Sequence, residues 1–458
     1  MRAEPLEALG ALTDAAWLVG GAVRDELLGR STQDYDVAVA GDAGELARDL
    51  RRVTGAHTFA LSEAFGAWRV LDRDRRWQVD LTPLMGATLE EDLARRDLTI
   101  NAIARGLGAE ELIDPFGGRV DLEGRRLRMV GPDAFSADPL RVIRLARLGS
   151  DLGFEVEAAT ADAAIDAAGG LRSVSAERVF AELRLIVTGP AAPSGLRAME
   201  ALGATAVVLP ELCTLHGVDQ SHYHHLDVHD HTIEVLERVI ELERDPEALF
   251  PGCGEEITAV LLEPLGSELS RGAGLRFGAL LHDVAKAQTR AVTTEGRVTF
   301  FGHDTEGAET ALAVLGRLRA GERLAAHVAA LTRHHLRLGF LVHEMPLDRR
   351  AVYRYLRACD PVEVDVTLLS VADRLATRGR NADRAIERHL ELAREILPDA
   401  LRWHRDRPRP PLRGDRLAAE LGIEPGPEVG RLLEELTEAA FAGEVRSEAE
   451  ALAWARRR

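Results

Sequence analysis

The chain has almost no lysine. Lys286 is its single lysine, so arginine supplies nearly all of the positive charge. Cysteine is scarce as well, with three residues among 458, and Cys213, Cys253 and Cys359 lie far apart. An odd number of widely spaced cysteines excludes a disulfide scaffold and a cysteine-based zinc site, and it suits a reducing cytosol.

Long apolar runs and an excess of positive charge are also missing. No apolar stretch approaches the roughly 18 residues that a membrane helix needs, and the N-terminal segment has no apolar core long enough for a secretory signal. We therefore expect a cytoplasmic protein without a membrane partner. The formal charge of −18, from 57 Lys+Arg against 75 Asp+Glu, argues against a surface that coats nucleic acid broadly.

The pattern of apolar residues changes along the chain. Up to about residue 110, strand-like and helix-like segments alternate, and residues 68–71 and 77–81 predict a hairpin. From about residue 138 onward, apolar residues recur at the three- and four-residue spacing of helices. Proline and glycine between residues 245 and 274 predict a loop-rich insertion, and RDRPRPP at 405–411 predicts a stiff linker.

Length and pattern together predict an α+β chain of several domains, because 458 residues exceed one ordinary core. We predict four parts, which are a small head with a mixed β-sheet (1–135), an all-α neck (136–215), an α-helical domain (216–400), and a linker with a short helical tail (401–458).

Two carboxylates follow a glycine-rich turn near the N-terminus. The segment LVGGAVRDELLG at 18–29 predicts a strand, a turn and a helix, and DYD at 34–36 begins the next strand. Asp34 and Asp36 are two residues apart, so they share one face of that strand. Paired carboxylates suit Mg²⁺ and two-metal phosphoryl transfer, with Asp80 on the predicted hairpin as a third candidate catalytic carboxylate.

The turn before these carboxylates is suited to phosphate. Gly20 and Gly21 have no Cβ, so backbone N–H groups there can approach a phosphate closely, and Arg24 adds charge one helical turn later. A Gly-Gly pair alone usually marks a turn, and an isolated D-x-D usually marks a solvated strand edge. Their joint order and spacing favour a functional site.

These segments resemble the class II nucleotidyltransferases, the family of CCA-adding tRNA nucleotidyltransferases and bacterial poly(A) polymerases. Four later segments match the family's motifs in order, namely RRDLTINAIA (95–104), DPFGGRVDLEGRRLR (114–128), DPLRVIRLARL (138–148) and SAERVFAEL (175–183). The resemblance covers about residues 1–215 and, more weakly, 410–458.

The resemblance implies roles for individual residues. Asp34 and Asp36 would hold Mg²⁺, and Asp138 with Arg141 would read the base edge of CTP or ATP. A carboxylate accepts from an exocyclic amine while arginine donates, so this pair can discriminate bases without a template. The remaining nucleotide-binding candidates are Gly20, Gly21, Arg24, Arg96, Asp97, Asn101, Arg144 and Arg147. Ala137 stands where the family usually has Glu, so an orienting contact that bears on the switch from CTP to ATP is missing.

An ordered set of histidines and aspartates occupies the helical second half. Histidine is the commonest metal ligand, and an adjacent His-Asp pair can bind one ion or bridge two. The segment LLHDVAK at 280–286 resembles the HD superfamily of metal-dependent phosphohydrolases, and Lys286 stands three residues after the aspartate, as in many HD proteins. The candidate ligands are His231, His282, Asp283, His303, His334 or His335, and Asp373.

The HD resemblance implies a divalent transition metal (Mn, Ni, Co or Fe) and a phosphohydrolase activity. In some tRNA nucleotidyltransferases a fused HD domain is a 2′,3′-cyclic phosphodiesterase and phosphatase, which would suit the cleaning of a damaged tRNA 3′ end. His222, His224 and His225 precede the ordered set, and we interpret them as leading into the domain.

We therefore expect transfer of CMP and AMP units from CTP and ATP to the 3′ end of tRNA, or of another RNA, with release of pyrophosphate. Seven arginines between residues 119 and 147 predict a narrow basic groove for that RNA on an otherwise acidic protein. The alternatives are an A-adding enzyme or poly(A) polymerase, a protein that is primarily an HD phosphohydrolase with an RNA-binding head, and a non-catalytic tRNA-binding protein. The sequence leaves the oligomeric state open.

Overall fold

The structure, a computed structural model, describes residues 4–109, 111–220, 225–266, 269–378 and 382–458. The chain divides into two compact units, residues 1–186 with 194–208 and residues 187–193 with 209–458. The finer four-part division at residues 135, 215 and 400 stays a prediction. Among the described residues, no helix combines the length and apolar character needed to cross a membrane.

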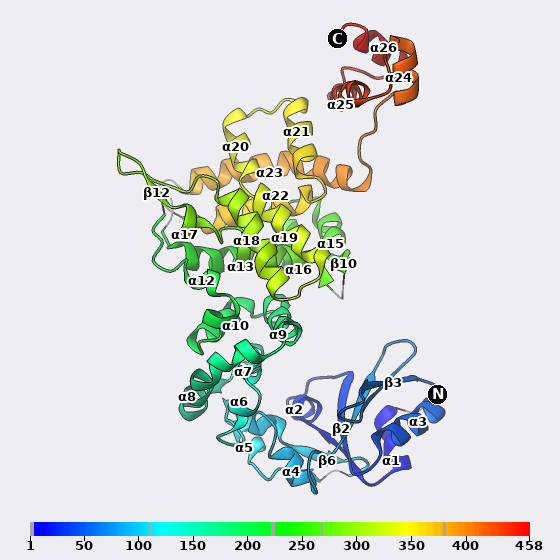
Figure 1. The fold of residues 1–458 in the computed structure, drawn as a ribbon, viewed down its shortest axis with the longest axis vertical. Coiled ribbons are helices and arrows are strands. Elements are labelled where there is room, and N and C mark those ends of the chain that lie inside the picture. The colour runs from blue at the N-terminus through cyan, green and yellow to red at the C-terminus, as the bar shows by residue number, and fades with distance from the viewer. Residues whose placement is uncertain (1–3, 110, 221–224, 267–268, 379–381) are drawn as a thin grey trace. The chain divides into compact units, whose positions relative to one another are not determined.

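The first unit is built on a seven-stranded mixed sheet (Figure 1). Its strand order is β3-β4-β5-β2-β1-β6-β7, and β2 and β5 are parallel while the other neighbours are antiparallel. The predicted hairpin is confirmed as β4–β5, with Trp68 opposite Leu81. The strands are β1 (Ala16–Val19), β2 (Asp34–Val39), β3 (His57–Ser62), β4 (Ala67–Leu71), β5 (Gln78–Pro83), β6 (Ala104–Gly106) and β7 (Leu112–Ile113).

The larger apolar cluster of this unit lies on one face of the sheet, and the two candidate carboxylates lie on the other. Val37 and Val39 of β2 are buried with Leu50 of α3 (Ala43–Thr54) in one apolar cluster. Because side chains alternate along a strand, Asp34 and Asp36 lie on the opposite face. Each fully buried Val or Leu contributes about 1.5–3 kcal/mol, so this packing fixes which way β2 faces.

Helices surround and extend the sheet in the first unit. Some begin with a capping residue, as Asp42 illustrates by accepting hydrogen bonds from Gly44 N at 2.8 Å and Glu45 N at 3.0 Å before α3. The others are α1 (Pro5–Leu12), α2 (Gly21–Leu27), α4 (Leu89–Leu93), α5 (Gly118–Glu123), α6 (Ala134–Ala137), α7 (Arg141–Leu152), α8 (Ala158–Ala167), α9 (Ala176–Thr188), α10 (Ala192–Ala201) and α11 (Thr205–Val208), and a short strand pair joins β8 (Arg126–Leu127) to β9 (Glu155–Val156).

The second unit is a helical domain, as the sequence predicts. Its centre consists of α13, α16, α19 and α22, which contact one another through buried aliphatic residues such as Val235, Leu280 and Leu368. Its helices are α12 (Pro210–Cys213), α13 (Val228–Arg244), α14 (Pro246–Leu249), α15 (Gly254–Leu262), α16 (Arg271–Leu281), α17 (Lys286–Thr289), α18 (His303–Arg317), α19 (Glu322–His334), α20 (Arg337–Leu341), α21 (Arg349–Cys359), α22 (Glu363–Ala376) and α23 (Ala382–Arg405).

The predicted loop-rich insertion at 245–274 is wrong in part. Pro246 begins α14 and Gly254 begins α15, so these residues start helices instead of interrupting them. Proline suits the first helical position because its missing N–H would have no partner there. Short strand pairs also occur in this unit, β10 (Pro264–Gly266) with β11 (Leu269–Ser270) and β12 (Ala291–Val292) with β13 (Val298–Thr299), while residues 267–268 lie outside the described part.

The tail is a small helical cluster with its own core. Residues 406–413 contain no helix or strand, as the linker prediction requires, and are followed by α24 (Gly414–Leu421), α25 (Pro427–Phe441) and α26 (Glu448–Ala455). Its contacts with α21 are charged and aromatic. Arg350 pairs with Glu444 at 2.7 Å, and Tyr353 packs against Phe441 with ring centroids 5.6 Å apart.

Candidate functional sites

The first site is a cavity of about 570 Å³ in the first unit. Asp34 and Asp36 line it, as do the glycines of the β1–α2 turn. Asp36 is exposed at the cavity, yet the protein around the carboxylate partly desolvates it and raises its pKa, against the charge of Arg96 and with the help of the charge of Asp80. Two close carboxylates facing a polar cavity fit a hard divalent cation such as Mg²⁺.

Asp80 has a different environment from the other two carboxylates. It lies opposite Asp36 in the parallel register of β2 and β5. Both of its oxygens accept hydrogen bonds from Arg69 of β4, each at 2.7 Å. Its catalytic role stays a prediction, and metal binding there requires Arg69 to release at least one oxygen. Arg69 is a site residue that sequence reasoning missed, because only the strand register reveals it.

The glycine turn and the second motif meet at this cavity. Gly20 has φ +71°, and an added Cβ would lie 2.6 Å from Arg96 Nη1. Only glycine both tolerates that backbone and lets the guanidinium approach. Arg24 donates to Asn101 Oδ1 at 2.8 Å, and Asn101 in turn donates to Asp97 Oδ1 at 3.0 Å. The structure therefore brings these predicted nucleotide-binding residues together in one network.

Asp97 is the buried carboxylate of this network. Burial alone would raise its pKa, but the charge of Arg144 and hydrogen bonds from Asn101 and the Leu98 N–H together lower it. Arg144 Nη2 lies 3.3 Å from Asp97 Oδ2, and no hydrogen-bond donor is aligned with that oxygen among the described residues. Asp97 thus acts as the negative centre that holds Arg144 and Asn101 at the cavity.

Residues of the third motif (114–128) support the second motif (95–104) through hydrogen bonds and close packing. Asp114 accepts hydrogen bonds from Gly118 N at 2.7 Å and Arg119 N at 2.9 Å, which caps α5. Asp121 accepts from the Thr99 hydroxyl at 2.6 Å. An added Cβ at Gly118 would lie 2.1 Å from Thr99 O, so glycine is required for this close packing. These residues position the Asp97–Asn101 segment without lining the cavity.

The two predicted base-reading residues are held in different ways. Asp138 Oδ2 accepts a hydrogen bond from Arg178 Nη2 of α9 at 2.7 Å. Arg141 donates to the Ala134 carbonyl at 2.9 Å and to the Arg95 carbonyl at 2.6 Å, and it lines the cavity. Both Arg141 contacts use backbone acceptors, so its charge stays available to a ligand. Sequence reasoning missed the contact from Arg178, although its motif was noted.

Three arginines on one side of α7 reach the cavity, and carboxylates pair with two of them. Arg141, Arg144 and Arg147 all line it. Arg147 Nε lies 2.9 Å from Glu182 Oε2 of α9, and Arg144 is paired with Asp97. The earlier arginines of the predicted groove, between residues 119 and 128, do not line this cavity. Arg125 donates instead to the Leu152 carbonyl and Arg128 to Asp121. Further cavity cations come from other segments, namely Arg24, Arg95 and Arg96.

The second site is a buried cluster of histidine and aspartate in the helical unit. Asp283 is its centre. Its side chain and those of His231 and His282 form one group whose potential ligand atoms lie within 4.8 Å of one another, and the same holds for Asp283 with His303 and His335. A carboxylate shared by two such groups is suited to bridging two metal ions.

The histidines present the same ring atom to this centre. The Nδ1 atoms of His282, His303 and His335 lie 2.8, 2.7 and 2.6 Å from the backbone carbonyls of Ala279, Phe300 and Thr332. A carbonyl only accepts, so each Nδ1 carries a proton, and each Nε2 can offer a lone pair to a metal when it carries no proton itself. Burial also lowers the pKa of His335 to about 4, which keeps its ring neutral, as a metal ligand must be.

The remaining predicted members occupy the edge of this cluster. His231 Nε2 lies 3.0 Å from Asp373 Oδ1, and Lys286 Nζ lies 2.6 Å from Asp283 Oδ2. Burial alone would raise the pKa of Asp283, but the charges of His282 and Lys286 hold it well below its ordinary range. His334 lies elsewhere and accepts a hydrogen bond from Arg337 Nε at 2.8 Å. Of the adjacent pair, the structure therefore brings only His335 into the cluster.

The cluster opens into a cavity of about 830 Å³. His303, His335 and Asp373 line it together with Lys286. The donor set of imidazole nitrogens and carboxylate oxygens fits a divalent transition metal. The cavity is large enough for a nucleotide-sized ligand.

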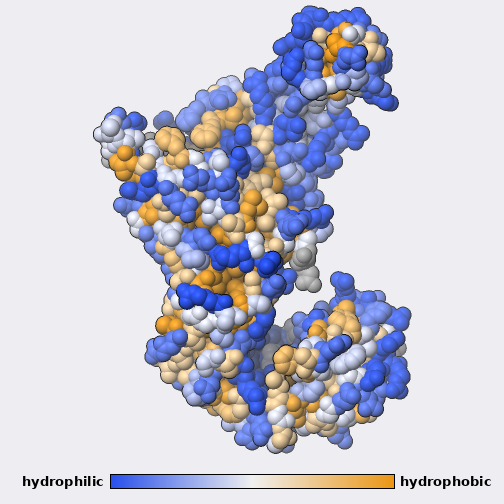
Figure 2. All heavy atoms as spheres, in the orientation of Figure 1, coloured by the Kyte–Doolittle hydropathy of each residue, from blue (hydrophilic) through white to orange (hydrophobic). Residues whose placement is uncertain are grey.

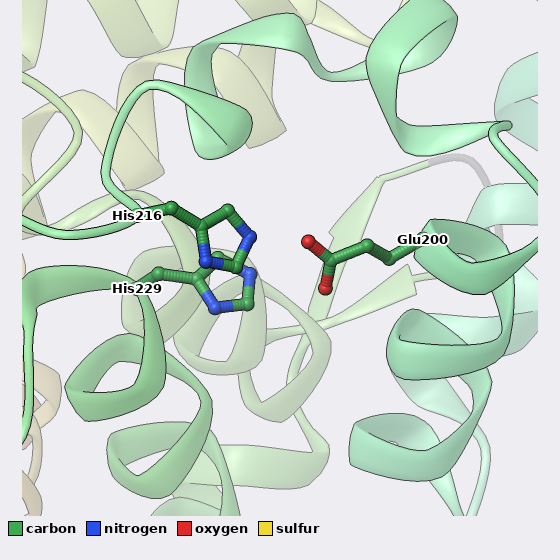
Figure 3. A group of neighbouring side chains, drawn as sticks. All are labelled: Glu200, His216 and His229. Atoms are coloured by element: carbon green, nitrogen blue, oxygen red, sulfur yellow. The ribbon is translucent and has the colours of Figure 1, made fainter.

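Another histidine pair lies outside this cluster in the same unit. The rings of His216 and His229 stack with centroids 3.7 Å apart and an interplanar angle of 27° (Figure 3). His222 and His224 lie outside the described residues, and His225 Nε2 lies 3.5 Å from Glu234 Oε2. His216 and His225 precede α13, and His229 lies in its first turn.

Comparison with protein families matches three consecutive parts of the chain. Residues 16–128 match the model described as the Poly A polymerase head domain, and residues 153–215 match the model described as the probable RNA and SrmB-binding site of polymerase A. Residues 228–378 match the HD domain.

Several characterised relatives align with most of the chain. An A-adding tRNA nucleotidyltransferase of Deinococcus radiodurans is 37% identical over 96% of this chain and 95% of its own length. A CC-adding tRNA nucleotidyltransferase of Thermus thermophilus is 36% identical over 96% and 92%. A multifunctional CCA protein of Halorhodospira halophila is 36% identical over 69% and 72%.

Solved structures share the fold at lower identity. The apo form of a CCA-adding enzyme matches with a TM-score of 0.66 at 21% identity, covering 99% of this chain and 94% of that one. The Thermotoga maritima CCA-adding enzyme complexed with tRNA matches with a TM-score of 0.61 at 20% identity, covering 100% and 96%. With its five ordered motifs, its mixed-sheet head and full-length relatives of one kind, the chain belongs to the family of tRNA nucleotidyltransferases that carry a poly(A) polymerase-type head and an HD domain.

Proposed function

We propose that the first unit adds nucleotides from CTP and ATP to the 3′ end of tRNA without a nucleic-acid template, completing the CCA sequence. The observation that carries this proposal is the single cavity that holds Asp34 and Asp36 beside the glycine turn and Arg141. At the two carboxylates, bound Mg²⁺ would act as a Lewis acid toward the attacking hydroxyl and the departing pyrophosphate.

The chain's own residues perform the remaining tasks. Arg24 and Arg96 lie beside the glycine turn and bind the triphosphate oxygens, while Asn101 orients the sugar. Arg141 donates to the base edge, and Asp138 accepts from the exocyclic amine that cytosine and adenine share. The 3′ hydroxyl of the RNA attacks the α-phosphorus, the bond to the leaving pyrophosphate breaks, and the hydroxyl proton passes to solvent.

Addition of AMP alone is the second candidate. It is supported by the 37% identity to an A-adding enzyme over 96% of the chain. Ala137, which stands where the family usually has Glu, bears on the switch from CTP to ATP and leaves both candidates open. Incubation with each labelled NTP and two acceptors, one tRNA lacking CCA and one ending in CC, separates the reactions. We expect CTP and then ATP to be incorporated into the first acceptor. Incorporation only of ATP, into the second, would establish A addition, and incorporation only of CTP would establish CC addition.

We further propose that the second unit is a metal-dependent phosphohydrolase for phosphate esters at the RNA 3′ end. The carrying observation is Asp283 shared between two groups of potential metal ligands, with three Nε2 atoms directed at it. Bound Mn²⁺, Ni²⁺, Co²⁺ or Fe²⁺ would supply a hydroxide at neutral pH. Hydrolysis of 2′,3′-cyclic AMP by the protein, tested with each metal and with His282→Ala, examines this proposal. Equal turnover by the variant would refute it.

A further inference from the structure

Within the described part of the chain, two guanidinium groups in the HD-unit cavity form no ion pair with a carboxylate. Arg374 lines the cavity, and within the described residues its buried Nε has no hydrogen-bond acceptor. Arg388 also lines it and donates to the Val342 carbonyl at 3.3 Å, its one hydrogen bond to the described residues. Several other arginines of this unit are paired with carboxylates, as Arg276 is with Glu243 at 2.7 Å. Unneutralised cations that line a cavity are suited to an anionic ligand.

The helices α22 and α23, which carry Arg374 and Arg388, place these arginines next to the His-Asp cluster. Ser370, Asp373 and Arg374 of α22 are three and four residues apart, so they share one side of the helix. The Ser370 hydroxyl lies 3.2 Å from His389 Nε2 of α23, which fixes the position of α23 beside that side. Arg388 directly precedes His389. The cavity therefore continues from the cluster at Asp373 to Arg374 and then to Arg388.

Large aromatic side chains are exposed in the same cavity. Phe301 is 85% exposed and Phe340 is 66% exposed, and both line it. Figure 2 shows a small hydrophobic group among polar residues at the β12–β13 hairpin, which ends at Thr299, just before Phe300 and Phe301 in the chain. Exposed aromatic rings beside cations are the combination that binds single-stranded nucleic acid, because each stacked base contributes about 1–3 kcal/mol.

A single phosphate would leave these cations unused. The scissile phosphate of a mononucleotide belongs at the His-Asp cluster, and a 2′,3′-cyclic mononucleotide has no other. We propose that this cavity takes the 3′ end of an RNA at least two nucleotides long, with Arg374 and Arg388 binding the phosphodiester upstream of the one that is hydrolysed. Phe301 and Phe340 provide stacking surfaces for its bases. This inference rests on the proposed phosphohydrolase function of the unit.

The reaction on such an end is a hydrolysis that needs no further reactant. The oxygen of water forms a bond to the phosphorus of the terminal cyclic phosphate, and the bond from phosphorus to one ribose oxygen breaks. That oxygen takes a proton, and the other ribose oxygen keeps the phosphate as a monoester. The upstream phosphodiester is bound but not changed.

The kinetic test compares a mononucleotide with a dinucleotide. The substrates are 2′,3′-cyclic AMP and ApA ending in a 2′,3′-cyclic phosphate, with wild type, Arg374→Ala, Arg388→Ala and Arg323→Ala. Arg323 is the second residue of α19, about 18 Å from His335 at 1.5 Å per residue, and is the matched control. We expect wild type and Arg323→Ala to prefer the dinucleotide over the mononucleotide at least tenfold in kcat/KM. In Arg374→Ala and Arg388→Ala, we expect this preference to be smaller.

A binding test does not depend on turnover. Fluorescence anisotropy measures how a labelled ApA with a 3′-phosphate binds the metal-depleted full chain at several salt concentrations. Loss of one phosphate contact lowers the slope of log Kd against log salt by about 0.7 for a single strand. We expect that decrease for Arg388→Ala and no decrease for Arg323→Ala.

The outcomes separate this inference from the function on which it rests. If neither cyclic substrate is hydrolysed with any metal, the phosphohydrolase proposal fails, while the salt slopes still test RNA binding. If both substrates are hydrolysed equally well by wild type, or if the salt slope of Arg388→Ala matches wild type, the RNA inference is overturned. Competition by ADP as strong as that by the dinucleotide would overturn it too, by showing that a free nucleotide supplies the second phosphate.

Discussion

Arg178 Nη2 lies 2.7 Å from Asp138 Oδ2, so a residue of α9 holds the carboxylate that we assign to base reading. The arginine side chain is 54% exposed and the aspartate 26% exposed. An ion pair of this exposure contributes little to folding stability. Its effect therefore lies in the direction of the Asp138 carboxylate, at a site where the usual orienting glutamate is replaced by Ala137.

Arg178→Ala is expected to reduce discrimination among nucleotides. Without the arginine, Asp138 samples other rotamers and accepts less well from the amine of cytosine or adenine. We expect the kcat/KM ratio of the preferred nucleotide to UTP to fall about tenfold, within the 1–3 kcal/mol of a good base contact. The melting temperature should change little. An unchanged ratio would show that Asp138 is oriented by other contacts.

The carboxylates of the head are expected to differ in importance. Asp34→Ala should lower single-turnover nucleotide incorporation about a thousandfold or more, because metal-assisted charge stabilisation is worth several kcal/mol. Asp80→Asn should lower it less than about tenfold, since both Asp80 oxygens are engaged by Arg69. Filter binding of tRNA provides the control for folding. Equal losses in the two variants would show that Arg69 releases Asp80 during catalysis.

The two units are expected to lose activity separately. His282→Ala removes a buried member of the His-Asp cluster, so the bound transition metal, measured by mass spectrometry, and hydrolysis of 2′,3′-cyclic AMP should both be lost. Nucleotide incorporation should remain within about twofold of wild type, because the head has its own carboxylates. Asp34→Ala is the reciprocal control. Loss of incorporation in His282→Ala would mean that the helical unit contributes to the transferase.

Folding stability is expected to depend on pH through His389. Burial lowers the pKa of this ring to about 4, and the charge of Arg374 lowers it further while Asp373 opposes the shift. The unfolded chain, with an ordinary histidine pKa near 6.5, binds the proton first as pH falls. Stability is therefore lost between about pH 6.5 and pH 4, by up to about 3 kcal/mol from this group.

Calorimetry in the presence of a chelator measures this dependence. His389→Asn keeps a polar group near the Ser370 hydroxyl but cannot bind the proton. We expect its unfolding temperature to fall less steeply than that of wild type between pH 6.5 and pH 4.5. Parallel curves would show that other groups, such as His335, account for the whole dependence.

Local geometry made part of the head predictable. Strand alternation is enough to place Asp34 and Asp36 on one face, and a charged turn between apolar runs is enough to predict the β4–β5 hairpin. The parallel pairing of β2 with β5 could not be predicted from the sequence, because a helix and two strands separate these strands along the chain. That pairing sets Asp80 opposite Asp36 and brings Arg69 within reach. The contact of Arg178 with Asp138 likewise joins distant segments.

In the HD cluster, the sequence predicted most of the members but could not choose between two adjacent residues. The order of its histidines and aspartates was sufficient to predict which residues gather, since α18 and α19 pack as neighbours and carry His303 toward His335. The choice between His334 and His335 could not be made, because adjacent helical residues point about 100° apart and the rotation of α19 depends on its packing. Arg374 and Arg388 carried no motif at all.

Lys286 has a chemical consequence beyond its contact with Asp283. It is the single side-chain primary amine among 458 residues, and it is 8% exposed at the wall of the HD-unit cavity. Any amine-directed modification of a side chain, whether enzymatic acetylation or a laboratory reagent, must therefore act in that cavity or nowhere. A reporter group attached to this amine would mark one position in the chain, and protection of the amine would measure how fully a ligand fills the space around it.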